Sequence, residues 1–297
     1  MGIELAGLSW NPLGDLEQLT EFSFMVQALE AGTIVATMAG AIGWFMVLRR
    51  QTFAGHTLSV VAFPGAAGAT LAGLPLAAGY FGACGIAALA LSRVSRPGRE
   101  SLSSESAAIG TVQAFGLGLG FLFVTLYSGQ LSDLQSLLFG TFLGITAAQV
   151  QTLFWVALAA LAILAAIGRP LLFASVDGAV ARASGVPTGG LALVFLLLLG
   201  LAVAATAEIT GALLVFALLV TPPATAQQIT IRPGPGLVLS VALALAVTWL
   251  GLGIAYFSPY PVGFWVTSLS FGLYVTVRLV RGILARRYRH DPLGAPA

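Results

Sequence analysis

The sequence predicts an all-α polytopic membrane protein, and three observations lead to that fold class. Of its 297 residues, 58% are hydrophobic and 8% are charged, whereas soluble domains average about 25% charged residues. The apolar stretches are about 20 residues long, which suits transmembrane helices and not the shorter alternating strands of a membrane barrel. The 13 basic residues are all arginine, and they separate these stretches. Apolar stretches and arginines together therefore outline successive membrane spans.

The arginines predict which ends of the spans lie in the cytoplasm, because basic residues beside a span stay on that side. They fall in five clusters: Arg49 and Arg50; Arg93, Arg96 and Arg99; Arg169 and Arg182; Arg232; and Arg278, Arg281, Arg286, Arg287 and Arg289. The first 30 residues hold acids and no base. We therefore expect the N-terminus outside and the C-terminus in the cytoplasm.

Counting crossings between these clusters gives about nine spans. The first runs from Ala31 to Leu48, and the 42 residues between Arg50 and Arg93 hold two spans with a turn at Leu74 and Pro75. Three hairpins follow: Ala107 to Tyr127 with Ala147 to Ile167, Leu191 to Ala207 with Ile209 to Ala226, and Leu237 to Tyr256 with Val262 to Val280. We expect one transmembrane domain over residues 1–290 and a cytoplasmic tail over residues 291–297.

Two of the outer turns of these hairpins carry an acidic residue, Asp133 in one and Glu208 in the other. The first outer turn spans Ser128 to Asp133 and is followed by a short helix near Leu134 to Leu143. Glu208 is expected at the second turn as a solvated carboxylate at the membrane interface. The spans themselves are left with almost no charge.

Several kinds of protein are excluded by the residues that are missing. The chain has no lysine, so it cannot contain a Walker loop ending in Gly-Lys-Ser/Thr and does not hydrolyse ATP by that route. Its single cysteine, Cys84, excludes an internal disulfide and a cysteine-rich zinc cluster.

The cytoplasmic stretch from Arg169 to Gly190 predicts a short helix between two spans. Ser175 or Asp177 can act as its N-cap, residues 179–183 favour helix, and Gly185 is a plausible stop. A short helix held between two spans can transmit motion rigidly to both. The alternative is an ordinary solvated loop.

Five blocks of mostly small and apolar residues occur along the chain: Met46–Gly65 (MVLRRQTFAGHTLSVVAFPG), Ala107–Phe121, Ser136–Thr146, Ser175–Pro187 and Thr210–Gln227. In this order and at this spacing they resemble blocks of the permease subunits of zinc and manganese ABC transporters. One block alone would be a weak signal, but together the five cover nearly the whole chain.

The resemblance implies a multi-pass permease of the plasma (inner) membrane that is not an enzyme and binds no cofactor or nucleic acid. It implies a homodimer that works with separate ABC ATPase chains, which use the ATP, and with an extracellular substrate-binding protein. The short cytoplasmic helix would be the coupling helix that rests on the ATPase, and its residues are Asp177, Val180, Ala181, Arg182 and Gly185. The missing Walker loop agrees with a motor on another chain.

The resemblance also implies a metal site, at which this sequence departs from the family. The family's Asp and His ligands, four residues apart on one helix face, fall at His56 and Val60. Val60 has no ligand atom, so the pair is broken. His56 could still bind metal, with a second copy or with the oxygens of Thr57 and Ser59; it could line a pathway for another substrate; or it could be a structural histidine.

Three functions remain open on these residues. The first is import of a divalent metal such as zinc or manganese by alternating access, driven by a partner ATPase. The second is an ABC importer of the same architecture for a substrate that is not a metal. The third is a stand-alone secondary carrier, which would need intramembrane acids for ion coupling. Pro222 and Pro223 predict a kink that would let one span bend during such a cycle.

Overall fold

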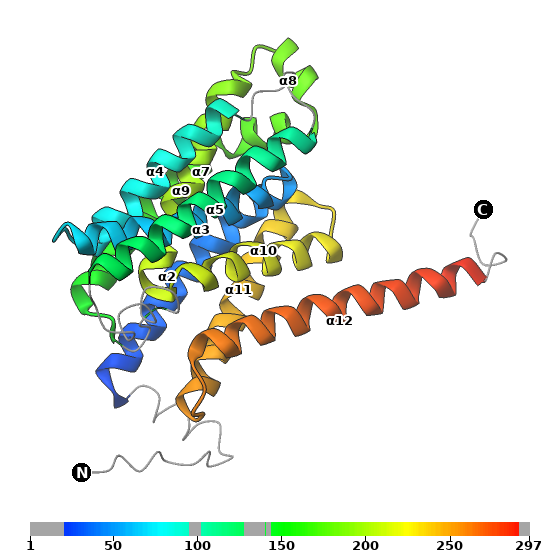
Figure 1. Ribbon diagram of the computed structural model, residues 1–297. Coiled ribbons are helices and arrows are strands. Elements are labelled where there is room, and N and C mark those ends of the chain that lie inside the picture. Colours follow the sequence, from blue (N-terminus) through cyan, green and yellow to red (C-terminus); the bar gives the residue numbers. More distant parts are fainter. Residues whose placement is uncertain (1–20, 95–101, 128–139, 141–143, 291–297) are drawn as a thin grey trace.

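The fold is all-helical throughout the described part of the chain, as predicted. The computed structural model describes residues 21–94, 102–127, 140 and 144–290, and it contains no strand there. The helices, labelled as in Figure 1, are α2 (Ser23–Leu48), α3 (Thr52–Leu71), α4 (Leu76–Val94), α5 (Leu102–Leu126), α7 (Ala147–Val176), α8 (Gly178–Ala183), α9 (Thr188–Thr210), α10 (Ala212–Ile229), α11 (Pro233–Tyr256) and α12 (Val262–His290).

Each predicted span falls on one of the long helices in this described part. Seven of them are long and apolar enough to cross a membrane; α3 and α10 are not among the seven. The count of nine spans, the orientation of the termini and the single domain over residues 1–290 therefore stay predictions. The predicted outer turn at Ser128–Asp133 and the short helix near Leu134–Leu143 lie outside the described residues.

Three helices extend beyond the predicted spans, which corrects their boundaries. α2 begins at Ser23 and not at Ala31, α7 continues through Pro170 to Val176, and α12 continues to His290. Hydropathy marks only the part of a helix that lies in the bilayer. Backbone hydrogen bonds and helix-forming residues such as arginine carry the helix further into the aqueous phase.

Local signals explain where two of the helices begin. α7 starts after Thr146, where a capping box joins the Thr146 and Gln149 side chains to each other's backbone amides. α11 starts with Pro233 in its first turn, a position where the missing N–H leaves no hydrogen bond unmade.

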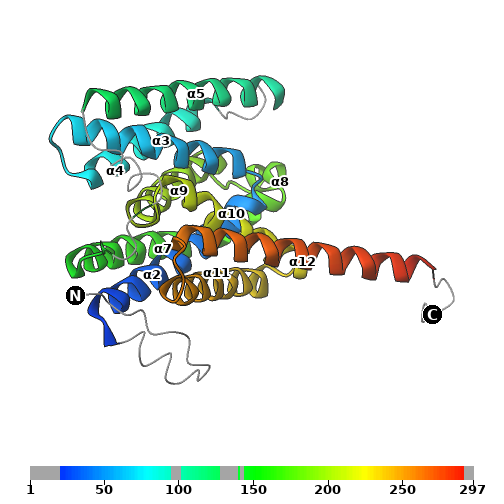
Figure 2. The same ribbon diagram turned by 60° about the horizontal axis from the view of Figure 1, so that its bottom comes forward.

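The helices pack in layers. Figure 2 shows α5, then α3 and α4, then α9 and α10, then α2, α7 and α11. α12 packs on α10 and α11, and its C-terminal part extends away from the bundle. α2 contacts α7, α9, α10 and α11, and α3 contacts both α4 and α5. α9 contacts α2, α3, α4, α7 and α10, so it connects these two groups of helices.

Small residues allow α2 to approach its neighbours closely. A Cβ at Gly40 would lie 2.8 Å from the Val241 Cα of α11, and a Cβ at Gly43 would overlap the Leu219 carbonyl of α10. The Ser240 hydroxyl donates to the Gly40 carbonyl at 2.7 Å, and the Gln227 amide donates to the Trp44 carbonyl at 2.8 Å. Contact of this kind stabilises helix pairs in a membrane, where lipid removes most of the hydrophobic drive.

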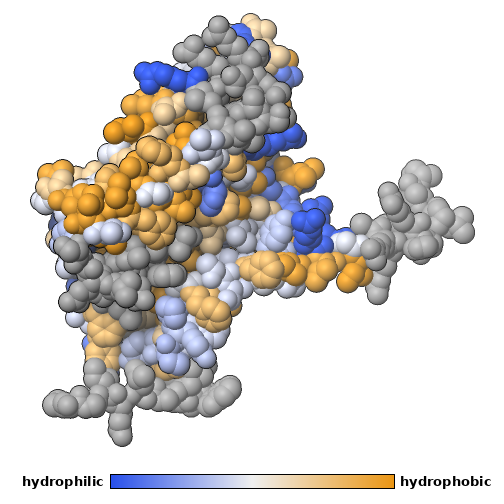
Figure 3. All heavy atoms as spheres, viewed as in Figure 1, coloured by the Kyte–Doolittle hydropathy of each residue, from blue (hydrophilic) through white to orange (hydrophobic). Residues whose placement is uncertain are grey.

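The arginine-bearing ends of several helices meet on one face, as the predicted topology requires. Arg49, Arg93 and Arg182 line the same cavity, and the Arg281 guanidinium of α12 donates to the Gln228 carbonyl at the end of α10. In Figure 3 apolar side chains cover much of the viewed bundle, while hydrophilic ones lie mostly toward the end that carries α8.

A Gly43→Ala substitution tests the close packing of α2. Because the added methyl overlaps backbone of α10, we expect the free energy of unfolding to fall by about 1–3 kcal/mol, measured by thermal unfolding in detergent. The control is Gly85→Ala, where a Cβ meets nothing within 4 Å. It should leave stability unchanged or raise it by up to about 1 kcal/mol through helix propensity. Equal effects of the two substitutions would contradict the packing.

Candidate functional site

A small cavity in the bundle contains the predicted pathway histidine. Its volume is about 100 Å³, and it is lined by His56, Ser59, Val60 and Phe63 of α3, Leu117 of α5, and Ala212 and Phe216 of α10. Three of the four predicted pathway residues therefore share one cavity. The one-turn spacing of His56 and Val60 on α3 brings both to it, as expected for residues four apart.

The imidazole of His56 is held against an aromatic ring and has a free nitrogen. Its ring centroid lies 4.8 Å from that of Phe216 at an interplanar angle of 61°. Its Nδ1 is buried and has no hydrogen-bond partner among the described residues. Buried polar atoms are usually paired, so an unpaired imidazole nitrogen is available to bind a ligand.

Thr57 does not belong to this cavity. Its side chain is 1% exposed, and its hydroxyl donates to the Phe53 carbonyl at 2.9 Å. The same oxygen accepts from the Gln113 amide of α5 at 2.8 Å. Thr57 thus ties α3 to α5, whereas Ser59 lines the cavity and donates to the His56 carbonyl at 2.8 Å.

A break between α9 and α10 positions the wall of the cavity that lies opposite α3. Gly211 separates the two helices with φ 76° and ψ 156°, a backbone region that is almost restricted to glycine. Ala212 follows directly, so the first turn of α10 faces His56. The signal that could have located this break is the lone glycine in an otherwise apolar run.

This junction is buried, which corrects the predicted outer turn at Glu208. Ile209, Thr210 and Ala212 are at most 4% exposed, and Gly140 packs directly against the backbone at the break. Glu208 lies in the last turn of α9, half-buried, and close enough to Tyr80 of α4 to act on it electrostatically. Tertiary packing covers a turn that a count of about 20 residues per span placed at the membrane interface.

The cavity offers few ligands from a single chain. No group of three His, Cys, Asp or Glu side chains that could hold a metal ion occurs within the described ranges. Val60 provides only carbon atoms, as the sequence indicated. A cation here would therefore need further ligands beyond His56.

The predicted short helix between two spans forms as α8. Asp177 is its N-cap, with Oδ1 accepting from the Ala179 and Val180 amides at 2.9 Å each. Gly185 follows its end with φ 81°. Ala181 is fully buried, while Val180 is 50% exposed and Arg182 is exposed. One side of α8 is thus anchored to the helix bundle, and its other side is exposed at the surface.

Pro222 and Pro223 lie inside α10 without interrupting it. A proline at position 223 cannot donate to the carbonyl four residues earlier, which is that of Leu219. This is the carbonyl against which Gly43 of α2 packs. The prolines thus coincide with the closest approach of α2 and α10, and the predicted kink stays a prediction.

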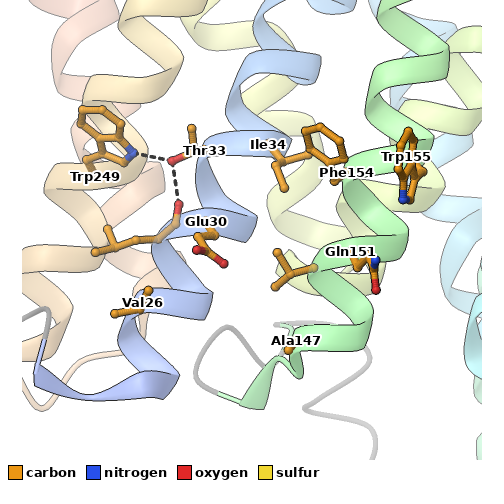
Figure 4. A pocket seen from close by; sticks show the side chains of 11 residues that line it. Val26, Glu30, Thr33, Ile34, Ala147, Gln151, Phe154, Trp155 and Trp249 are labelled. Carbon is orange, nitrogen blue, oxygen red and sulfur yellow. Dashed lines mark hydrogen bonds between the residues drawn. The ribbon is translucent and has the colours of Figure 1, made fainter.

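A larger cavity lies elsewhere and contains none of the predicted site residues. It is a groove of about 970 Å³ between α2, α7 and α11. Figure 4 shows Glu30 of α2 and Gln151 of α7 beside it, with the Trp249 indole donating to the Thr33 hydroxyl at 2.9 Å. Because its lining is mainly apolar and partly aromatic, it suits lipid-facing surface better than a polar pathway.

A bundle of long apolar helices with a buried helix break and a short connecting helix, α8, is typical of a multi-pass membrane permease. The chain belongs to the ABC 3 transport family, whose sequence model matches residues 21–281. The resemblance of its five sequence blocks to ABC permeases is thereby confirmed.

Similar proteins match over nearly their whole length. The manganese transport system membrane protein MntC of Halalkalibacterium halodurans is 31% identical over 279 residues, which cover 92% of this chain and 94% of that protein. The chelated iron transport system membrane protein YfeC of Yersinia pestis is 30% identical, with 95% and 97% covered. A chain in the structure of PsaBC from Streptococcus pneumoniae in complex with Fab superposes with a TM-score of 0.80 at 26% identity, covering 89% of this chain and 94% of that one.

A Gly211→Ala substitution tests the helix break. The side chain would be forced into a glycine-only region, so we expect the free energy of unfolding to fall by about 1–3 kcal/mol and amide exchange in residues 212–216 to accelerate. Gly272→Ala in α12 is the control, because a Cβ there meets no atom within 4 Å and no positive φ is involved. Unchanged stability and exchange in Gly211→Ala would show that α9 and α10 do not break there.

Proposed function

We propose that this chain is the permease of an ABC importer for a divalent metal ion. The observation that supports it most directly is the unpartnered, buried Nδ1 of His56, which lies in a cavity at the position of the family's metal ligands. Imidazole nitrogen is a good ligand for zinc and other first-row transition metals. Relatives named for manganese and for chelated iron transport favour the same class of substrate.

The ligand set favours a homodimer with the path at its interface. One chain brings a single imidazole to the cavity, and Val60 cannot complete a pair. A second copy would bring a second His56, and water or the Ser59 oxygen could fill the remaining positions. Such a site has fewer anionic ligands than an Asp-His pair and would hold the ion more loosely, which assists its release.

Energy for transport would come from a separate ATPase chain acting through α8. The exposed side of α8, with Val180 and Arg182, offers a surface for such a partner, and buried Ala181 connects it to the bundle. Closure of the ATPase would move α8 and α9 together and open the His56 cavity to the opposite side. An extracellular binding protein would supply the ion at the other end.

An ABC importer for a substrate other than a metal ion is the second candidate. The observation that favours it is the composition of the His56 cavity, whose walls are mainly valine, leucine, alanine and phenylalanine. Such walls suit a less strongly hydrated substrate, with His56 as a hydrogen-bonding group.

A His56→Ala substitution distinguishes these candidates. If His56 is a ligand, uptake of manganese and zinc into cells should fall at least tenfold while the protein level in the membrane is unchanged. Val60→Ala is the matched control, since it alters the same cavity without removing a ligand atom, and should retain uptake. Normal metal accumulation in His56→Ala cells would contradict the metal assignment.

The role of α8 is tested by two substitutions of Asp177. Asp177→Ala removes the cap and should weaken α8 by about 0.5–2 kcal/mol, so that ATP hydrolysis by the complex continues while uptake falls. Asp177→Asn keeps a cap of similar strength and should keep uptake near normal. Full uptake in the Ala variant would remove α8 from the coupling path.

A further inference from the structure

A second polar cavity lies at the arginine-bearing ends of the helices, outside the His56 site. Its volume is about 660 Å³, and it is bordered by the ends of α2, α4 and α7, by α8 and by the start of α9. Arg49, Arg93 and Arg182 line it together with Ser92 and Thr188, and no carboxylate is among its described lining residues. Three cations gathered without an acid create a field that attracts anions.

Arg49 is held in position at this cavity. Its guanidinium donates to the Ser175 hydroxyl at 3.2 Å and to the Gln51 side chain at 3.4 Å, and lies 5.4 Å from the centre of the Phe195 ring. Partial burial lowers the pKa of Arg49. A bound anion would replace the solvation that the guanidinium has lost.

The acid closest in sequence to the lining of the cavity is already engaged. Asp177 precedes the lining residue Gly178, but its Oδ1 accepts from two amides of α8. Asp177 therefore caps α8 and is not among the described residues that line the cavity.

The cavity changes from polar to apolar along the helices. On α4 the lining passes from Arg93 to Leu89, one turn deeper, and on α9 from Thr188 to Leu193 and Leu196. A free phosphate or nucleotide would gain nothing from these leucines. An amphipathic anion with a charged head and an apolar body fits both parts.

The cavity also borders lipid-facing surface. α4 and α7 both pack on α9, which lies between them. Leu89 is 39% exposed, and Ile86 on α4 and Phe173 on α7 are likewise exposed apolar side chains. A lipid can therefore enter from the membrane beside these helices.

We propose that this cavity binds the headgroup of an anionic phospholipid from the cytoplasmic leaflet. Its phosphate lies among the three arginines, which can form bidentate charge-assisted hydrogen bonds with phosphate oxygens. Its glycerol and the first acyl carbons lie against Leu89 and Leu193. Basic pockets between membrane helices on this side commonly hold such lipids, and the positive-inside arrangement of the arginines places the cavity there.

A bound headgroup would also contact α8, because Gly178 and Arg182 line the cavity. Lipid composition would then influence the helix that we assign to coupling. This second step rests on the proposed function, whereas lipid binding itself does not. The groove between α2, α7 and α11 (Figure 4) has Glu30 as the one charged residue among its described lining. A negative lining residue is not complementary to an anionic headgroup.

The test is a lipid titration of the full-length protein, purified in detergent and monitored by native mass spectrometry. Phosphatidylglycerol should bind at least tenfold more tightly than phosphatidylcholine, and Arg93→Gln should weaken phosphatidylglycerol binding about tenfold. Arg50→Gln is the matched control: it removes an exposed arginine next to Arg49 that does not line the cavity. It should leave binding unchanged.

Four outcomes would overturn the proposal. The first is equal binding of the two lipids, and the second is equal weakening by Arg50→Gln and Arg93→Gln. The third is unchanged lipid binding in Arg93→Gln together with weaker association of the ATPase chain, which would make the cavity a protein-docking site. Competition by inorganic phosphate at the affinity of phosphatidylglycerol would identify a free-anion site instead. Metal uptake is not measured in this experiment. A negative result would therefore contradict the lipid proposal and leave the metal assignment unaffected.

Discussion

The close approach of α2 to α10 and α11 is the constraint on which the rest of the structure depends. Gly40 and Gly43 carry no side chain, so backbone meets backbone, and the Ser240 hydroxyl adds a hydrogen bond inside the contact. In a bilayer the lipid is as apolar as leucine, so helices associate through such shape and hydrogen bonding. The position of α10 in turn decides where Ala212 and Phe216 stand opposite His56.

The site combines a half-buried imidazole, whose Nδ1 is fully buried, with a broken helix. Gly211 ends α9 and lets α10 start in a new direction inside the bundle. Broken helices are tolerated within membranes where protein covers the free backbone groups, and they occur at substrate sites of other transporters. Here buried neighbours and Gly140 cover the break. The result is a small cavity whose two walls belong to helices with different axes, so that a relative movement of α3 and α10 would change its shape.

The end of the molecule that carries α8 joins two features that the sequence presents separately. The Asp177 cap fixes the start of α8. The cavity lined by Arg49, Arg93 and Arg182 also borders this helix. A partner on α8 and a lipid among the arginines would act on the same turn of helix. Charged contacts with a partner or a lipid lie at the membrane surface, where water screens them. Neither contact alone would hold α8 in place. The buried Ala181 side chain anchors the helix to the bundle.

The sequence by itself determined the membrane class, the approximate place of each helix, the arginine clusters between the helices and a short helix capped by Ser175 or Asp177. These follow from hydropathy, charge and capping, which act over a few neighbouring residues. Only the tertiary structure decided that Thr57 turns to α5, that the turn after Glu208 is buried, and that Arg49, Arg93 and Arg182 share a cavity. Such relations depend on the rotation and spacing of helices far apart in the chain, which close packing at glycines sets and no local pattern records.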